Sequence, residues 1–354
     1  MAVPELVVLA EQLLAPVPGG TGRYTAELLR ALAATAPEGW TVTAAVARHA
    51  DTGPAEILGA PRVLPLPPRA LVAAWQLGLP LWPGGDAVHA PTPLAPPRAP
   101  RGRTLSVTVH DTVPWTHPET LTPRGVSWHR SMVARAARRA DALVVPTAAV
   151  ADDLAARVRR TAPVRVAGHG VTELPAPGAE LDLPERYVLA VGTIEPRKGI
   201  DVLIEAMGSL DVPLVLAGQP GWGGLDPLAL AARHGVAGVR VLGRVTDAEL
   251  ATVLRGAAVL AAPSLAEGFG LPVLEAMAAG VPVVHSDAPA LVEVAGGAGR
   301  VVPARDADAL ATALREVLGS AELAGRMRAA GLSRAADFTW SSAAEVVWSV
   351  HAGR

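Results

Sequence analysis

The chain has 354 residues, more than a single hydrophobic core usually serves, so we expect two domains. A formal net charge of −2 argues against a nucleic-acid-binding protein, and the lack of cysteine excludes disulfides, thiolate zinc sites and cysteine nucleophiles. The apolar runs are shorter than a membrane-spanning helix needs, and the N-terminus has no signal-peptide pattern, so we expect a cytoplasmic protein.

Short runs rich in Val and Leu alternate with longer segments of helical period, as in βαβ units around a buried parallel sheet. In the first half we expect strands at 5–11, 41–46, 86–89, 104–109 and 141–145, with helices near 20–35, 124–139 and 148–158. In the second half we expect strands near 187–192, 213–218, 239–243, 258–262, 281–285 and 299–302, with helices near 199–208, 226–234, 247–256, 271–279, 288–295, 306–318, 321–334 and 341–351. This order predicts an α/β protein with two Rossmann-like, doubly wound sheets.

Three proline-rich stretches interrupt this alternation. Residues 171–185 contain three prolines and a glycine without a sustained apolar period, so we expect them to link the two domains. The stretches 61–68 and 91–100 are expected to be stiff loops.

The segment 263–284, PSLAEGFGLPVLEAMAAGVPVV, carries the strongest functional signal. It follows a predicted strand, so Glu267 and the glycines are expected at the carboxyl end of a parallel strand, where open α/β sheets bind ligands. Pro272 suits the first turn of the following helix. The amides of Gly268-Phe269-Gly270 would then lie at a helix N-terminus, which favours phosphate oxygens.

The spacing of Glu267 and Glu275 raises the question of a glycosidase acid/base pair, whose carboxyl groups lie about 5–9.5 Å apart. Eight helical residues would span roughly 12 Å, so two separate ligand contacts are the better interpretation. Taken alone, the two glutamates could also be a solvated loop acid and an acid that complements the helix dipole.

Residues 188–199, VLAVGTIEPRKG, predict a strand, a turn and the start of a helix. Arg197 and Lys198 put two cations near a helix N-terminus, against the dipole preference, which indicates an anionic ligand unless the pair is merely solvated. Lys198 is the single lysine among 31 basic residues. Because an ammonium and a guanidinium are not interchangeable at a crowded phosphate, this lysine is a candidate phosphate ligand.

Two segments of the first half complete the pattern: PGGTGRY at 18–24 and VTVHDTVPWTHPE at 107–119. Together with the segments above, they resemble the donor-site motifs of family-four glycosyltransferases, and the resemblance covers nearly the whole chain. It implies the GT-B architecture, in which two Rossmann-like domains face a cleft and a C-terminal helix crosses back to the first. The implied domains are 1–173 plus 338–354, which would bind the acceptor, and 174–337, which would bind the donor.

The resemblance assigns roles in the second domain. Glu267 would contact a donor-sugar hydroxyl near the reacting centre, and Glu275 would bind the nucleotide ribose. Arg197 and Lys198 would bind the diphosphate leaving group, while Thr193 stands where many members carry arginine. The residues whose backbone would hold the sugar and phosphates are Gly268, Phe269, Gly270 and Leu271.

The resemblance also assigns roles in the first domain. Gly20 and Gly22 would form a glycine loop that lets the backbone approach the donor phosphate, although a tight turn before a helix would need the same glycines. His110 would lie near the donor sugar, where the alternative is a structural histidine. His117 and Trp115 are weaker candidates for the acceptor side.

Residues 124–139 predict a basic helix with five arginines, Arg124, Arg130, Arg135, Arg138 and Arg139. Such a helix could lie on an anionic membrane surface, or it could be the solvated outer face of a Rossmann helix. The expected association with the inner face of the membrane is peripheral and weak.

The resemblance implies transfer of a hexose, with retained anomeric configuration, from a nucleoside diphosphate sugar to a hydroxyl of a glycan, lipid-linked or small-molecule acceptor. No metal or other cofactor is expected to be required. GDP-mannose is the leading donor, because the motifs GGTGRY, HDTVPWTHPE and VGTIEPRKG most resemble the mannosyltransferase branch.

Other functions could share the doubled fold: a nucleotide-sugar epimerase, a glycosyl phosphorylase, or a non-catalytic subunit that binds nucleotide sugars. A dehydrogenase is disfavoured, because Thr25 stands where a dinucleotide fingerprint starting at Gly20 needs its third glycine.

Overall fold

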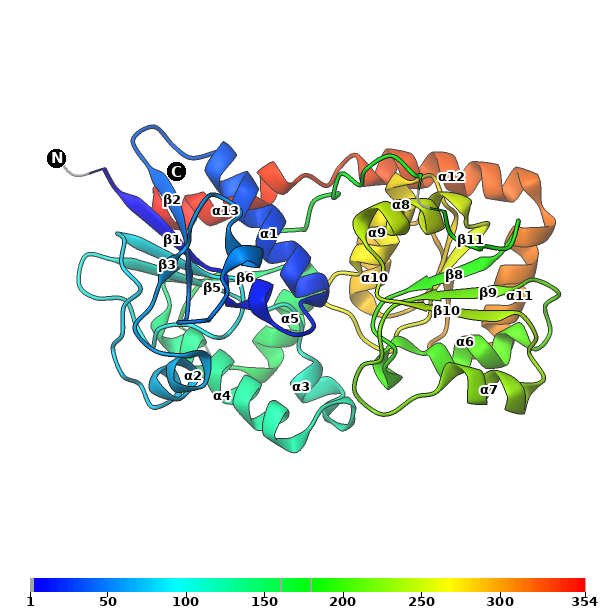
Figure 1. Ribbon diagram of the computed structural model, residues 1–354, viewed down its shortest axis with the longest axis horizontal. Helices are drawn as coiled ribbons and strands as arrows, with labels where there is room; N and C mark the ends of the chain where they lie inside the picture. Colours follow the sequence, from blue (N-terminus) through cyan, green and yellow to red (C-terminus); the bar gives the residue numbers. More distant parts are fainter. Residues whose placement is uncertain (1–2, 160, 179, 354) are drawn as a thin grey trace. The chain divides into compact units, whose positions relative to one another are not determined.

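The computed structural model describes residues 3–159, 161–178 and 180–353, which form two compact units (Figure 1). The first unit consists of Met1–Pro118, Thr122–Gly170 and Thr339–Arg354, and the second of Glu119–Leu121 and Val171–Phe338. Apart from the short segment Glu119–Leu121, the chain passes between the units at Gly170/Val171 and again at Phe338/Thr339. The domain limits at 173/174 and 337/338, with their acceptor and donor roles, stay a prediction.

The first unit is built on a parallel sheet with the strand order β3-β2-β1-β4-β5-β6-β7. Its strands are β1 Glu5–Leu9, β2 Thr41–Val46, β3 Arg62–Val63, β4 Ala87–Ala90, β5 Thr104–Thr108, β6 Ala142–Val145 and β7 Val164–Val166. Its helices are α1 Gly19–Ala34, α2 Pro68–Gln76, α3 Val113–Thr116, α4 Pro123–Arg139, α5 Ala148–Arg157 and α13 Trp340–His351.

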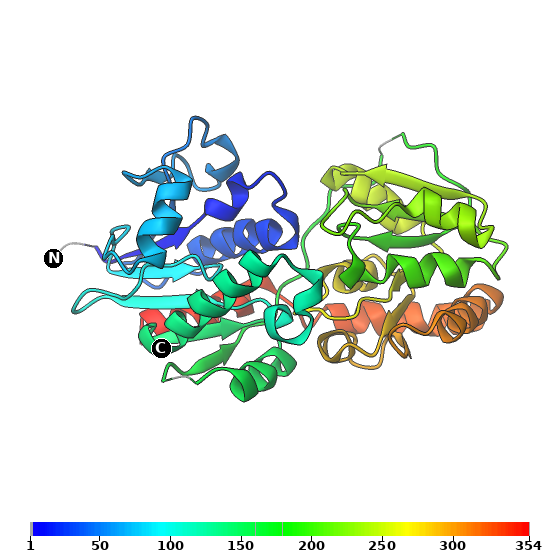
Figure 2. The same ribbon diagram turned by 90° about the horizontal axis from the view of Figure 1, so that it is seen from below.

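Alternation along β5 separates the two faces of this sheet. Leu105 and Val107 point into an apolar core formed with side chains of α2, α4 and α5. Thr104 and Ser106 point to the other face, where both bond His351 of α13. Figure 2 shows α2 and α4 in front of the sheet and α13 behind it. Helix α13 packs there against α1 and β5, as expected for a C-terminal helix that crosses back.

The second unit repeats the plan with a parallel sheet of order β10-β9-β8-β11-β12-β13. Its strands are β8 Val188–Val191, β9 Leu214–Ala217, β10 Val239–Gly243, β11 Val259–Ala262, β12 Val283–Ser286 and β13 Arg300–Val302. Its helices are α6 Ile200–Met207, α7 Pro227–His234, α8 Asp247–Gly256, α9 Leu271–Ala278, α10 Pro289–Ala295, α11 Ala307–Gly319 and α12 Ala321–Ala335. The predicted α/β class with two Rossmann-like sheets is therefore confirmed.

The expectation of a loop at 61–68 was wrong. The stretch 61–68 is not only a loop, because β3 pairs with β2 there and α2 begins at Pro68. Proline is compatible with a first helical turn, since the amide it lacks has no partner within the helix. Gly20 and Gly22 lie in the first turns of α1, which begins at Gly19, in agreement with the helix predicted near 20–35.

Candidate functional site

The loops after β8 and β11 lie against each other in the second unit because the two strands are neighbours in the sheet. Arg197 and Lys198 occupy a short 3-10 turn, Pro196–Lys198, and Gly199 follows in a left-handed conformation with φ +65°. A Cβ atom at Gly199 would lie 2.3 Å from the Pro263 carbonyl oxygen, so only glycine allows this approach. The amide of Leu265 donates to the Arg197 carbonyl at 2.8 Å and fastens the two loops together.

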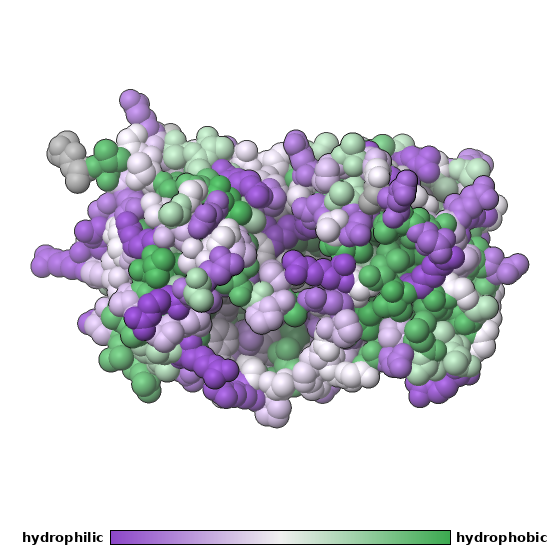
Figure 3. Space-filling model, viewed as in Figure 1, coloured by the Kyte–Doolittle hydropathy of each residue, from purple (hydrophilic) through white to green (hydrophobic). Residues whose placement is uncertain are grey.

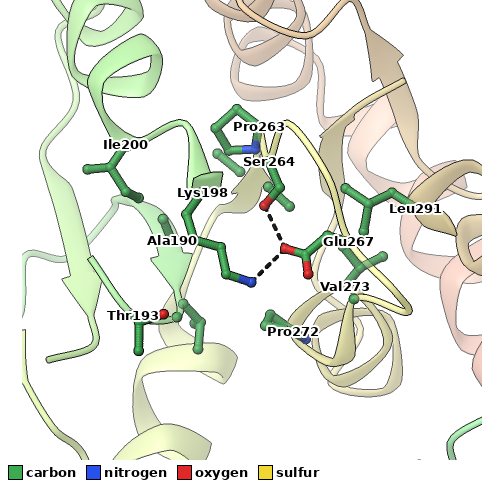
Figure 4. Close-up of a pocket in the computed structure, with 15 residues that line it drawn as sticks. Ala190, Thr193, Lys198, Ile200, Pro263, Ser264, Glu267, Pro272, Val273 and Leu291 are labelled. Carbon is green, nitrogen blue, oxygen red and sulfur yellow. Dashed lines mark hydrogen bonds and ion pairs between the residues drawn. The ribbon is translucent and has the colours of Figure 1, made fainter. Parts of the chain in front are cut away.

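The side chains of Lys198 and Ser264, one from each loop, point to the carboxylate of Glu267 (Figure 4). Lys198 Nζ lies 2.6 Å from Oε1, and Arg197 approaches Oε2 at 3.2 Å. Ser264 Oγ donates to Oε1 at 2.7 Å. The side chain of Glu267 is only 11% exposed, so these contacts replace most of its water.

The charge state of Glu267 follows from these partners. Burial by itself would raise its pKa, but the positive charges of Lys198 and Arg197 and the hydrogen bonds from Lys198 and Ser264 lower the pKa to about 2. Glu267 is therefore a carboxylate at neutral pH and has no proton to give to a leaving group. This excludes a general-acid role in the glycosidase manner.

The guanidinium of Arg197 is held by three hydrogen-bond acceptors. It donates to the Ala266 carbonyl at 2.8 Å and to Glu195 Oε1 at 2.7 Å, in addition to Glu267. Its side chain is 18% exposed, compared with 15% for Lys198. The two cations are thus placed in advance and partly removed from water, and both are paired with carboxylates.

The glycine-rich turn before α9 forms another wall of this pocket. Gly270 precedes α9 with φ +96°, and a Cβ atom there would lie 2.3 Å from Cδ2 of Leu291. The pocket lining includes Thr193, Lys198, Ser264, Glu267 and Gly270. The N-terminus of α9 and Lys198 therefore border the same cavity, which suits a phosphate group.

The remaining predicted residues of the second unit lie beside this pocket. Phe269 is buried and packs edge-on against Phe338, with ring centroids 5.7 Å apart. Glu275 is buried within α9, at 5% exposure, and Leu271 is the first residue of that helix. The two glutamates thus occupy different surroundings, Glu267 among cations and Glu275 inside a helix.

The chain ends of β8 and β9 meet through their backbones at Gly192, which lines the pocket. A Cβ atom at Gly218, after β9, would lie 1.8 Å from the carbonyl oxygen of Gly192, after β8. Gly192 itself has φ +142°, and the nearest atoms to a Cβ there would belong to Lys198. The chain ends of these two strands touch without any side chain between them.

His110 lies in the first unit, directly beyond β5. Its Nε2 donates to the Pro91 carbonyl at 2.8 Å, and the ring of Tyr24 packs edge-on against it at 4.7 Å. Burial lowers the pKa of His110, although the Pro91 carbonyl and Asp111 oppose the shift. His110 is therefore neutral at pH 7, and Nδ1 carries the lone pair.

Gly22 at the start of α1 has a steric explanation. A Cβ atom at Gly22 would lie 2.4 Å from Cβ of Pro18, whereas nothing lies within 4 Å of a Cβ at Gly19.

Trp115, one of the two acceptor-side candidates, packs under Arg130, whose Cζ lies 6.0 Å from the ring. The other, His117, follows α3 directly.

Comparison with known proteins decides the family. The family described as "Glycosyl transferases group 1" matches residues 177–334, and the one described as "Glycosyltransferase Family 4" matches residues 18–173. The chain belongs to the family-four glycosyltransferases. O-antigen chain mannosyltransferase B of Escherichia coli is 39% identical to it over 163 residues, which are 44% of this family-four chain and 43% of that relative. The match thus spans less than half of the relative.

Solved structures resemble this family-four chain over nearly its full length. Sucrose-phosphate synthase of Thermosynechococcus elongatus has a TM-score of 0.75 at 22% identity, covering 97% of this chain and 96% of that one. HepE of Anabaena, in complex with UDP and glucose, has a TM-score of 0.71 at 18% identity, covering 97% and 98%. At these identities the likeness establishes the GT-B fold alone.

Sequence reasoning missed two serines of the site in this family-four chain. Ser264 bonds Glu267 directly, and Ser286 Oγ donates to the Ser264 carbonyl at 2.5 Å from the end of β12. Ser264 stands in the quoted motif, so its distance of three residues from Glu267 was a usable signal. Ser286 had no such signal in the sequence, because its contact with Ser264 depends on the pairing of β11 with β12.

Proposed function

We propose that the protein transfers a hexose from a nucleoside diphosphate sugar to an acceptor hydroxyl, with retention of the anomeric configuration. The observation that carries this proposal is the convergence of Lys198 and Arg197 on the Glu267 carboxylate, beside the N-terminus of α9. An anion-binding pocket next to a permanently ionised carboxylate suits a donor that combines a diphosphate with a sugar.

The two cations would act on the leaving group. Breaking the bond between the sugar and the diphosphate develops negative charge on the phosphate oxygen, and fixed positive charges stabilise that charge. Two such cations supply the compensation that a metal ion provides elsewhere, so we propose that no metal is required. The leaving phosphate would accept the proton of the acceptor hydroxyl.

Glu267 would orient the sugar. As a carboxylate it accepts hydrogen bonds from sugar hydroxyls, and its charge lies close to the electron-poor sugar ring of an oxocarbenium-like transition state. Glu275 would bind the ribose, the backbone of Gly268 to Leu271 and Thr193 would hold the sugar and phosphates, and Gly20, Gly22 and His110 would complete the donor site, as the family motifs imply.

The proposed donor sugar follows from the name of a relative. A mannosyltransferase name is attached to the Escherichia coli relative, which makes GDP-mannose the leading donor, and UDP sugars the next to test. A glycan or lipid-linked hydroxyl is the proposed acceptor class.

The test starts with the wild-type protein and a series of nucleotide sugars. The true donor should raise the melting temperature by mass action, and incubation with an acceptor should release the nucleoside diphosphate and form a glycoside of unchanged anomeric configuration. An isomerised sugar without acceptor would instead indicate an epimerase, and phosphate-dependent cleavage a phosphorylase. Binding without any turnover would indicate a non-catalytic subunit. No response to any nucleotide sugar would refute the proposal.

We also propose peripheral membrane contact through the basic helix 124–139. The contacts of its arginines indicate which of them are available to bind lipid. Arg130 donates to the Pro114 carbonyl, and Arg135 to the carbonyls at the end of α2, so these two serve the fold. Arg138 and Arg139 are exposed, border a cavity with Arg98, and lie near Leu77, which is 80% exposed. Figure 3 shows apolar and strongly polar side chains next to each other over α2 and α4.

Exposed leucines beside arginines suit an anionic lipid surface. No helix of the described residues is long and apolar enough to cross a membrane. The variant Arg138→Ala/Arg139→Ala should bind vesicles containing phosphatidylglycerol more weakly than the wild type, whereas Arg326→Ala, an exposed change on α12, should not. Equal binding of all three proteins would refute membrane contact at this surface.

A further inference from the structure

A continuous line of buried polar side chains crosses the face of the first sheet that α1 and α13 cover. His351 of α13 bonds Thr104 Oγ1 through Nδ1 and Ser106 Oγ through Nε2, both at 2.7 Å. Ser106 Oγ also bonds Nδ1 of His89 at 2.8 Å. His89 and Ser106 are completely buried, so water does not replace these partners.

The line continues from His89 to the ring that contacts His110. Nε2 of His89 lies 3.2 Å from Thr108 Oγ1, and Thr108 Oγ1 lies 3.0 Å from the hydroxyl of Tyr24. Tyr24 is 1% exposed, and its ring meets the His110 ring edge-on, with centroids 4.7 Å apart and an interplanar angle of 89°. A chain of side-chain contacts thus connects α13 to His110.

The hydrogen-bond roles along this line follow an order in which each depends on its neighbour. A hydroxyl has one hydrogen, and a neutral imidazole donates through one nitrogen and accepts through the other. Ser106 has a hydrogen for only one of its two histidines, so at least one histidine donates to it, and the tautomer of that ring sets the role of its other nitrogen. Burial lowers the pKa of His89 and of His351, so both rings are in the neutral form that this order requires. Removing one member consequently disturbs the bonds of the others.

The ring of Tyr24 has a second set of neighbours from the same part of the fold. It lies 4.6 Å from the ring of His169, which stacks on Trp340 at 5.7 Å and 17°. Trp340 is the first residue of α13. The two ends of α13 thus reach Tyr24 by different routes, Trp340 through ring packing and His351 through hydrogen bonds.

We propose that His351 is a positioning residue for His110, acting through Ser106, His89, Thr108 and Tyr24. This inference rests on the proposed function, in which His110 meets the donor sugar. The Pro91 carbonyl holds Nε2 of His110, which leaves Nδ1 as the acceptor for a substrate hydroxyl. The hydrogen bonds from His351 to the Tyr24 hydroxyl fix the position of the Tyr24 ring. The Tyr24 ring in turn fixes the orientation of the His110 imidazole, which packs against it edge-on.

Three variants test the inference in the full-length protein, with His234→Gln, an exposed change on α7, as the matched control. His351→Leu removes both hydrogen bonds, His351→Gln keeps a neutral donor and acceptor, and Tyr24→Phe removes only the last hydroxyl and keeps the ring. Tyr24→Phe is nearly isosteric, so it keeps the test valid if His351→Leu does not fold.

We expect kcat to fall about 10- to 100-fold in His351→Leu and Tyr24→Phe, because small displacements of a substrate-contacting group cost this much. KM for the nucleotide sugar should stay within about twofold, since Lys198 and Arg197, the proposed ligands of the diphosphate, lie in the second unit. His351→Gln should recover most of the rate, and the control should match the wild type.

A second readout does not depend on turnover. In the protein with ¹⁵N-labelled histidine, the ring-nitrogen signals of His110 should move in His351→Leu and Tyr24→Phe, and stay in place in the control. Unchanged His110 signals and unchanged kcat in a folded Tyr24→Phe protein would overturn the inference. A wild-type protein without transferase activity would instead refute the proposed function, while the His110 signals would still report whether the line exists.

Discussion

Acidification should weaken the first unit through His351, and the size of the effect follows from its burial. His351 is 8% exposed, and its burial lowers its pKa from 6.5 to about 3. Because the folded-state pKa lies below the unfolded-state value, the unfolded chain binds more protons. Stability is therefore complete above about pH 6.5 and is lost as the pH falls from 6.5 towards 3.

At pH 5 the free energy of unfolding is lower by about 2 kcal/mol because of this one histidine. The unfolded-state pKa lies about 1.5 units above this pH, and each unit contributes about 1.36 kcal/mol. For a unit of this size the loss corresponds to a decrease of roughly 4–8 °C in melting temperature. Burial also lowers the pKa values of His89 and His169, so the wild type should lose more than this in total.

The assay is urea unfolding at pH 8 and pH 5, followed by far-UV circular dichroism, for the wild type, His351→Gln and the control His234→Gln. The quantity to compare is the change in unfolding free energy between the two pH values, so any uniform destabilisation by a variant cancels. We expect this change to be about 2 kcal/mol smaller in His351→Gln than in the other two proteins. An equal change in all three would show that His351 does not titrate with the unfolding of this unit.

Three further predictions concern the pocket of the second unit. Lys198→Ala should lower kcat about 100- to 1,000-fold, as loss of a charge-stabilising group does elsewhere, with Arg326→Ala as the unaffected control; a wild-type rate would refute the role of Lys198. Glu267→Gln should bind the free nucleoside diphosphate about tenfold more tightly in calorimetry while losing transfer, because Lys198 and Arg197 no longer pair with a carboxylate; weaker binding would contradict this. Gly199→Ala should lower the free energy of unfolding by more than about 1 kcal/mol, since φ is +65° and Pro263 blocks the Cβ; an unchanged melting temperature would contradict this steric conflict.

Local patterns predicted the second unit well. Strand runs such as VLAV and VLAA are continuous and apolar because both faces of their sheet are covered, and the functional motifs follow these strands directly. Strands at the edges were harder, since β3 has two residues and β7 three, too few for a periodic signal. Helix α2 was missed because its prolines were taken as loop signals, although proline is compatible with a helix start.

Contacts between distant residues limited the prediction of the site. The motifs gave Lys198 and Glu267 separately, but their ion pair joins residues 69 positions apart and needs the pairing of β8 with β11. The line from His351 to Tyr24 was invisible for the same reason, since it joins residues up to 247 positions apart. A buried serine or histidine has no local pattern that distinguishes it from an exposed one.

The contact between the chain ends of β8 and β9 limits how this pocket can diverge. Gly192 and Gly218 touch through backbone alone, so even an alanine at Gly218 would collide with the neighbouring carbonyl. A side chain at Gly218 therefore requires the two strands to move apart. Differences between related pockets are expected at lining residues that already carry a side chain, such as Thr193, and not at Gly218.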